Sequence, residues 1–560
     1  MRAVQLLSII FLWSQAAYAE VNPLVEKLKT TKSCVSCNLT GVDLSGIDLP
    51  NANLTRAILD EVNFSGANLQ GANLSNASLM EASFTKTNLS YANLTRATLN
   101  FSNFGFSNFS NANLSNAEIY AAFMNDTNLF QANLANTNLE WVNLNRSNLN
   151  RANLSGSNMK NVRMKEVSAQ NASLELADLT KAEISNADLR GSNLSGAVLI
   201  EAVLRNGSFE EVNFRLANLS NANLQSGDYL KSDFGEATLT KAILNNANFK
   251  QSNFAKADLS QARMQNSNFS DSIFDDAILK NIGGRNSEYI KSSFKRTNLE
   301  NATLSKSQFN GSIFSNAKMA NANLTETNLD QTIFNNAEMS YIKLDEATLL
   351  KSSFFNANLV NASLEDVTAN DSTFEKANLA SAKLSFSEFK DTNFRSAKLP
   401  SVKMTNSDLS MSDFSDATLS YAELNSSIFK EAHLRNAKMV NAKINGANFL
   451  NAKMSRATLN GSSGLGANFA GSDLTEAYMR NSIMTEANFK GAKIVSADMT
   501  DTNFSKAEFS DANLDNSSMN NANLANADLS GALVYRTNFV GAIFCNTKKP
   551  DATLDFSGCR

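Results

Sequence analysis

The sequence is poor in the residues that build catalytic centres and in those that interrupt hydrogen-bonded structure. Its 560 residues include four prolines, two tryptophans and one histidine, and charged residues make up 19%. A single histidine cannot supply a multi-histidine zinc site and leaves little room for a Ser–His–Asp centre. The net charge of −4 predicts no affinity for nucleic acid or for an anionic membrane. A hydrophobic content of 43% excludes a disordered chain.

Residues 1–19 have the pattern of a secretory signal peptide. Arg2 supplies the positive charge, residues 3–13 form a short apolar segment, and Ala17-Tyr18-Ala19 is a cleavage site. The apolar segment is shorter than the roughly 20 residues that a membrane-spanning helix needs. No later segment is apolar enough to span a bilayer. We therefore expect an exported protein without a membrane span, in the periplasm or outside the cell.

The four cysteines lie near the two ends, and an even number in an exported chain predicts disulfides. Sequence proximity favours the pairs Cys34–Cys37 and Cys545–Cys559. A redox-active Cys34-Val35-Ser36-Cys37 is the alternative, although the thioredoxin-like βαβ context is missing. Haem attachment would need histidine in place of Asn38. A zinc site would need two further ligands from another chain, so no metal or cofactor is expected.

One repeat runs through almost the whole sequence. Every fifth residue from Leu39 to Phe544 is a repeat centre, and these 102 positions hold large apolar side chains with four exceptions. The residue two before each centre is small or β-branched, and the others are mostly polar. A period of five fits neither a helix nor a strand. It indicates a chain that turns a corner every five residues and points one large and one small side chain inward.

The phenylalanines indicate how many corners close one coil. They recur at intervals of 20 residues, which corresponds to four five-residue units, and aromatic side chains can then stack from coil to coil. The two longest series are Phe214, Phe234, Phe254, Phe274, Phe294, Phe314, Phe334, Phe354, Phe374, Phe394 and Phe414, and then Phe429, Phe449, Phe469, Phe489 and Phe509. We therefore predict about 25 square coils of 20 residues, stacked as a repeat solenoid.

This pattern resembles the pentapeptide-repeat family, whose unit is written A(D/N)LXX, as in Ala67-Asn68-Leu69-Gln70-Gly71. The resemblance implies an all-β fold, a right-handed quadrilateral β-helix. The segments around Cys34–Leu39 and from Phe544 to Cys559 also resemble the ends of exported cyanobacterial members. For such a member the compartment would be the periplasm or the thylakoid lumen. Most of these relatives have no assigned activity.

The repeat divides the sequence into four parts. We predict a signal peptide (1–19), an N-terminal cap with the CxxC motif (20–37), the β-helix (38–545) and a C-terminal cap loop (546–560). Asn22-Pro23 is a helix-start signal, and it predicts a short helix that ends near Lys29. Open ends of a β-stack need covers, which gives the cysteines a structural role.

Four centres lack a large side chain, namely Ala169, Gly284, Ala369 and Gly464. A bulkier neighbour compensates three of them, as volume conservation in a packed core requires: Val167, Ile282 and Val367. At the fourth, Leu465 could turn inward. We interpret these positions as local bulges, with hinges at Gly284 and Gly464 as the alternative.

The outer positions carry no recognisable catalytic motif. His433 lies in a polar position and is expected to point outward. Aromatic residues stand out, because the repeat normally places polar residues outside, and exposed aromatic clusters often mark partner surfaces. Five lie off the centres within about two coils and form a candidate patch for an unknown protein partner: Phe101, Phe106, Tyr120, Phe130 and Trp141.

The leading hypothesis is a non-enzymatic exported scaffold or protein-binding module. The family suggests a second class, because some cytosolic members imitate DNA and bind gyrase. Export and the near-neutral charge oppose this alternative. A thiol-redox role of Cys34 and Cys37 is a third possibility. The sequence itself identifies no ligand, partner or oligomeric state.

Overall fold

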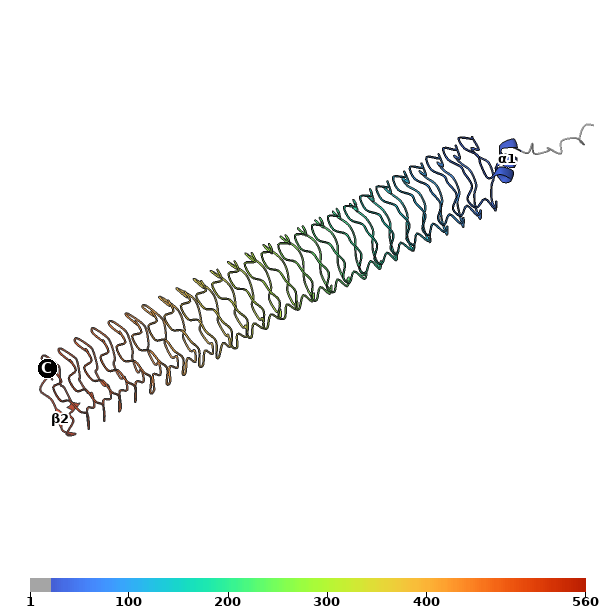
Figure 1. The fold of residues 1–560 in the computed structure, drawn as a ribbon. Coiled ribbons are helices and arrows are strands. Elements are labelled where there is room, and N and C mark those ends of the chain that lie inside the picture. Colours follow the sequence, from blue (N-terminus) through green and yellow to red (C-terminus); the bar gives the residue numbers. More distant parts are fainter. Residues whose placement is uncertain (1–21, 560) are drawn as a thin grey trace, which may run out of the picture. The chain divides into compact units, whose positions relative to one another are not determined.

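The computed structural model describes residues 22–559, so the predicted signal peptide lies outside the described residues. The chain forms two compact units, which divide between Asp233 and Phe234. Each unit consists of stacked coils (Figure 1). Among residues 22–559, no helix is long and apolar enough to cross a membrane.

Backbone hydrogen bonds between consecutive coils define the fold. Parallel bridges join residues that are 20 positions apart, with one bridge for each five-residue unit, as in Ser33↔Asn53 and Asn38↔Ile58. Within each unit the centres donate their N–H to the next coil, as Leu54 N does to Asn73 O at 2.7 Å, up to the last coil. The residue before a centre donates to the preceding coil. The predicted quadrilateral β-helix with four units per coil is therefore confirmed.

The interior is filled by the two predicted positions of every unit. The centres from Leu39 to Leu529 are buried, and the small residues two places before them are buried from Ala52 to Ala527. Serine is tolerated inside because its hydroxyl finds a partner. Ser102 Oγ donates to Leu79 O at 2.6 Å and accepts from Ala82 N at 3.1 Å. A buried hydroxyl that is paired in this way avoids the desolvation penalty.

Phenylalanine stacks on phenylalanine, as the 20-residue spacing predicts. In the N-terminal unit Phe64, Phe84 and Phe104 stack with ring centroids 5.0–5.2 Å apart. In the C-terminal unit the first series stacks from Phe234 to Phe414 at 4.5–5.1 Å. Parallel rings at this separation add to the stabilisation from apolar burial.

Asparagine is abundant because its side chain serves both the corner and the stack. Asn88 Oδ1 accepts from Ser90 N at 3.2 Å, which fixes the turn that follows. Its Nδ2 donates to Asn68 Oδ1 in the preceding coil at 3.0 Å. The second corner residue has a positive φ, as at Asn76 (57°), which asparagine and glycine adopt at low cost.

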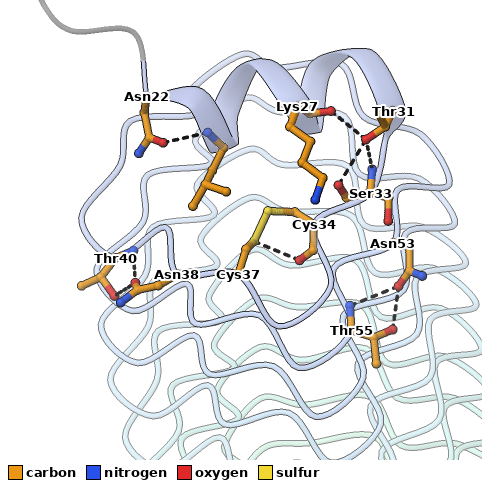
Figure 2. The surroundings of a disulfide bond; sticks show 11 residues. Asn22, Lys27, Thr31, Ser33, Cys34, Cys37, Asn38, Thr40, Asn53 and Thr55 are labelled. Carbon is orange, nitrogen blue, oxygen red and sulfur yellow. Dashed lines mark hydrogen bonds between the residues drawn. A yellow bond between two sulfur atoms is a disulfide. The ribbon is translucent and has the colours of Figure 1, made fainter.

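Helix α1 (Pro23–Thr31) lies at the N-terminal end and is slightly longer than predicted. Asn22 Oδ1 accepts from Leu24 N at 3.0 Å and caps its first turn, while Leu28 is fully buried. The helix ends at Thr31 because Lys32 takes a left-handed conformation. Beneath it Cys34 and Cys37 form a disulfide, with Cys34 buried and Cys37 half-buried (Figure 2).

The interpretation of the exceptional centres as local bulges is wrong. Gly284 N donates to Thr303 O at 2.8 Å and Gly464 N to Ile483 O at 2.7 Å, so the register continues unbroken. Ala169 and Ala369 keep the same bonds. At the two glycines, neighbouring side chains fill the missing volume.

At Gly284 the hydroxyl of Tyr289 fills that volume, since a Cβ would stand 2.6 Å from its Oη. At Gly464 the sulfur of Met484 would lie 2.7 Å from such a Cβ. Leu465 does not turn inward, because half of its side chain is exposed.

The C-terminal cap is more regular than the predicted loop. Strand β1 (Thr547–Lys548) pairs antiparallel with β2 (Leu554–Asp555), and the disulfide Cys545–Cys559 joins the segment to the last coil. β2 lies at the C-terminal end in Figure 1. The last centres, Val534, Phe539 and Phe544, are only half-buried, so the cap covers this end incompletely.

Two buried tyrosines give a matched test of the packing. Tyr229 Oη donates to Leu204 O at 3.2 Å, whereas Tyr289 Oη has no partner among the described residues. We expect Tyr229→Phe to lower the free energy of unfolding by about 1 kcal/mol, and Tyr289→Phe to change it less, because removal of an unpaired buried hydroxyl offsets the space left beside Gly284. Denaturant unfolding measures both. An equal loss in the two variants would contradict this account.

The second disulfide should stabilise its cap only locally, because each coil contacts only its neighbours. Cys545 and Cys559 are 14 residues apart, and opening a loop of this size costs up to about 3 kcal/mol. In a Cys545→Ser/Cys559→Ser variant, amide hydrogen exchange should accelerate at residues 547–558. Exchange at residues 429–509 should not change, and acceleration there would contradict the local role.

Candidate functional site

Three of the predicted patch residues share one corner of the N-terminal unit. Phe101 N donates to Tyr120 O at 2.9 Å, so these residues occupy the same corner in consecutive coils. Their rings meet edge to face, with centroids 5.6 Å apart. Ala121 N donates to Glu140 O at 2.9 Å, which places Trp141 at this corner one coil further on. Ala121 therefore lies between Phe101 and Trp141.

The side that starts at this corner carries two more aromatic residues. Phe123 bridges Asn103 and Asn143, so it stands in the middle of the side, where the repeat normally places a polar residue. Phe106 lies at the next corner. We call this set the aromatic face, and its side chains are exposed or, for Tyr120, half-buried: Phe101 (48%), Phe106 (59%), Tyr120, Phe123 (55%) and Trp141 (50%).

The sequence prediction missed Phe123 and included Phe130, which lies at a different corner. Phe123 stands directly before a centre, an outward position, so the rule that selected the other four could have found it. Phe130 O accepts from Asn111 N at 2.9 Å, one corner beyond that of Phe106. Phe130 is half-buried there and does not belong to the aromatic face.

Three members of the aromatic face hold an unfavourable backbone conformation. The φ angles are 61° at Phe101, 61° at Phe106 and 63° at Trp141. A left-handed conformation costs a bulky residue on the order of 1 kcal/mol, whereas asparagine and glycine adopt it readily. These aromatics therefore reduce the stability of the corners they occupy, which favours a role in binding.

A charged pair borders the aromatic face beside Phe106. Arg146 donates from Nε and Nη2 to the two carboxylate oxygens of Asp126 at 2.8 and 2.7 Å. These bonds, together with one from the Asn125 amide, hold the pKa of Asp126 below its usual value. The same carboxylate raises the pKa of Arg146. The two-point geometry fixes both side chains next to the apolar surface.

We expect Arg146→Gln to return the pKa of Asp126 toward its ordinary value, because the variant loses the guanidinium. A lowered pKa stabilises the folded state above the ordinary Asp range, and this contribution is lost as the pH falls through the folded-state pKa. The variant should therefore lose this stabilising contribution at a higher pH than the parent protein. Carboxyl NMR titration measures the shift. Arg151→Gln, which removes a cation that forms no ion pair within residues 22–559, is the control.

The structure places the other sequence candidates apart from the aromatic face. The cysteines form the pairs Cys34–Cys37 and Cys545–Cys559 at the ends of the repeat. His433 is exposed, and its Nε2 lies 3.0 Å from Lys453 Nζ. Within residues 22–559, no three His, Cys, Asp or Glu side chains are grouped as metal ligands.

The sequence matches the family model described as "Pentapeptide repeats (8 copies)". The matches extend from residue 37 to residue 546 with short gaps, the largest of which, 282–291, contains Gly284. Because they cover far more than half of the sequence, the chain belongs to the pentapeptide-repeat family. No match was found among curated proteins.

Solved pentapeptide-repeat structures are similar to parts of the chain. HetL of Nostoc sp. strain PCC 7120, involved in heterocyst differentiation regulation, is 21% identical, with 47% of this chain and 91% of HetL covered and a TM-score of 0.15. A pentapeptide repeat protein from the Arabidopsis thaliana thylakoid lumen is 32% identical, with 18% and 68% covered and a TM-score of 0.15. Rfr23 of Cyanothece 51142 is 29% identical, with 22% and 90% covered and a TM-score of 0.14.

Proposed function

We propose that this pentapeptide-repeat protein is a non-enzymatic binding module that recognises a protein partner through the aromatic face. The observation that carries the proposal is the concentration of Phe101, Phe106, Phe123 and Trp141 on one side of the coils, each about half exposed. Tyrosine, tryptophan and phenylalanine are enriched at the centres of protein interfaces. The Asp126–Arg146 pair would form part of a polar rim.

The coil architecture suits this role, because it holds the aromatic side chains on a preorganised backbone. The N–H groups of Phe101, Phe106 and Trp141 all donate to the next coil, at 2.9–3.2 Å. A partner would therefore meet groups whose backbone is already ordered, and binding would lose little conformational entropy.

Export into an oxidising compartment is part of the proposal. It is supported by the signal-peptide pattern of residues 1–19 and by two disulfides, because such bonds persist mainly outside the cytosol. The compartment would be the periplasm or the thylakoid lumen. Fractionation of the native host and N-terminal sequencing of the mature chain, expected to begin at Glu20, test this part.

The alternative functions have less support. A protein that imitates DNA needs a continuous negatively charged surface. On these coils cations often pair with anions of the next coil instead, as Lys306 does with Glu326 at 3.2 Å. A redox CxxC is expected in a thioredoxin-like βαβ context, whereas Cys34, which is buried, and Cys37, which is half-buried, lie between α1 and the first coil. Inhibition of gyrase supercoiling, or reduction of the first disulfide by thioredoxin, would favour these alternatives.

The strained corners allow loss of binding to be separated from loss of folding. Asparagine suits a left-handed corner, so we expect Phe101→Asn/Trp141→Asn to unfold at the same or a higher denaturant concentration than the parent protein. The same variant should lose its partner. A photo-crosslinking residue at Ala121 in the native compartment should give a defined adduct that disappears in this double variant.

Matched controls come from the C-terminal unit. Tyr341 and Tyr421 are exposed aromatics with φ of 58° and 61° at the equivalent corner position. Tyr341→Asn/Tyr421→Asn should leave the adduct at residue 121 intact, and a crosslinker at Ser381 should not capture the same partner. An adduct that survives Phe101→Asn/Trp141→Asn would show that the aromatic face does not recognise the partner.

A further inference from the structure

The C-terminal unit contains a surface cavity of about 590 Å³ that the proposed function does not use. This volume lies within the range of small-molecule sites. Its walls are entirely polar or charged, with no aromatic or aliphatic residue: Arg395, Ser415, Asp416, His433, Arg435, Asn436, Lys453, Ser455 and Asp473. A polar, hydrogen-bonding ligand therefore fits it better than an apolar one.

The cavity arises from alternating long and short side chains at one corner. Ser396 N donates to Ser415 O, and Asp416 N to Arg435 O, both at 2.9 Å, so the residues follow one another in consecutive coils. The order along the corner is Arg395, Ser415, Arg435 and Ser455. Each serine leaves space beside an arginine. The two arginines are two coils apart, which is about 10 Å at the usual strand spacing.

Three cations around the cavity have no acidic partner. Arg395, Arg435 and Lys453 form no ion pair within residues 22–559, whereas Arg456 and Arg480 nearby are paired with Glu476 and Asp498. Lys453 Nζ lies 3.0 Å from His433 Nε2. Because an ammonium can only donate, the imidazole accepts, and further ammonium hydrogens stay available for a ligand.

The two acids in the wall already have partners. Asp416 Oδ1 accepts from Asn436 Nδ2 at 2.9 Å. Asp473 Oδ1 accepts from the Thr475 hydroxyl at 2.6 Å, and Lys493 lies 3.9 Å from its other oxygen. Three cations in the wall are therefore left without an ion-pair partner within residues 22–559, against one carboxylate, Asp416, whose partner is the neutral Asn436 amide.

We propose that this cavity binds a sugar that carries a phosphate or sulfate ester. Arg395, Arg435 and Lys453 would hold the tetrahedral oxyanion, because guanidinium groups donate two parallel hydrogen bonds to such oxygens. The cavity has room for more than the ion itself. Ser415, Ser455 and Asn436 offer the hydroxyl and amide groups that pair with sugar hydroxyls. The Asp416 carboxylate is a further acceptor for a sugar hydroxyl.

Calorimetric titration of the mature chain tests the proposal with four probes: glucose 6-phosphate, glucose 6-sulfate, glucose and inorganic phosphate. We expect one of the two esters to bind at least tenfold more tightly than both glucose and inorganic phosphate, and the comparison of the esters identifies the oxyanion. Equal affinity for inorganic phosphate would refute the sugar part of the site. Failure of both esters to bind would overturn the proposal.

Two double variants locate the binding. Arg395→Gln/Arg435→Gln should weaken ester binding at least tenfold. Arg263→Gln/Arg285→Gln removes the same charge from two exposed arginines that also lack an ion pair within residues 22–559, and it should leave the affinity within twofold. Circular dichroism verifies that both fold. An equal loss in both variants would show that only net charge matters, and would refute a defined site.

Discussion

Hydrogen bonding between backbone groups 20 residues apart is the constraint on which the rest of this structure depends. The bond from Leu54 N to Asn73 O forms only if one coil closes in four units of five residues, and its repetition sets the register of every side chain. The register decides that centres stack on centres and corners on corners. Proline cannot donate this bond, which accounts for its scarcity in the sequence.

The same register carries the polar residues of the surface. Asn68, Asn88 and Asn108 form a ladder on one side, because residues 20 positions apart are always neighbours. Lysine–glutamate pairs such as Lys306 and Glu326 obey the same rule, although exposed pairs of this kind contribute little to stability. Surface side chains are therefore aligned from coil to coil, and residues 20 positions apart in consecutive coils are close enough to interact.

Sequence periodicity predicted the interior almost completely, because an inward position tolerates few residue types. The exceptional centres were misjudged for a physical reason. A missing side chain at Gly284 was expected to deform the backbone locally, whereas the hydroxyl of Tyr289 and the side chain of Leu304 occupy the space. The side chains that fill this space come from an adjacent side of the coil and from a neighbouring coil. The repeat of residues at one position of the coil does not reveal them. The coil-to-coil bonds then hold the register.

The surface was less predictable, because outer positions accept most residue types. Exposed aromatics could be recognised one by one, yet their grouping depends on which corner each one occupies, and this separates Phe130 from Phe101 and Trp141. The cavity near His433 had no motif at all. It depends on serine following arginine at one corner, a contrast in side-chain length rather than in residue pattern.

The two candidate sites show how such a scaffold can acquire binding without changing its fold. The interior is fixed by the register, so a substitution at a corner alters only the local surface and the local cost of a left-handed φ. Aromatic residues at 101, 106 and 141 raise that cost, whereas Arg395 and Arg435 leave the corner residues that follow them, Ser396 and Asn436, in ordinary left-handed conformations. Because stability in a stack of coils accumulates between neighbours, a local cost of this size does not spread along the unit. Strain at a corner can therefore persist wherever the exposed side chain contributes to recognition.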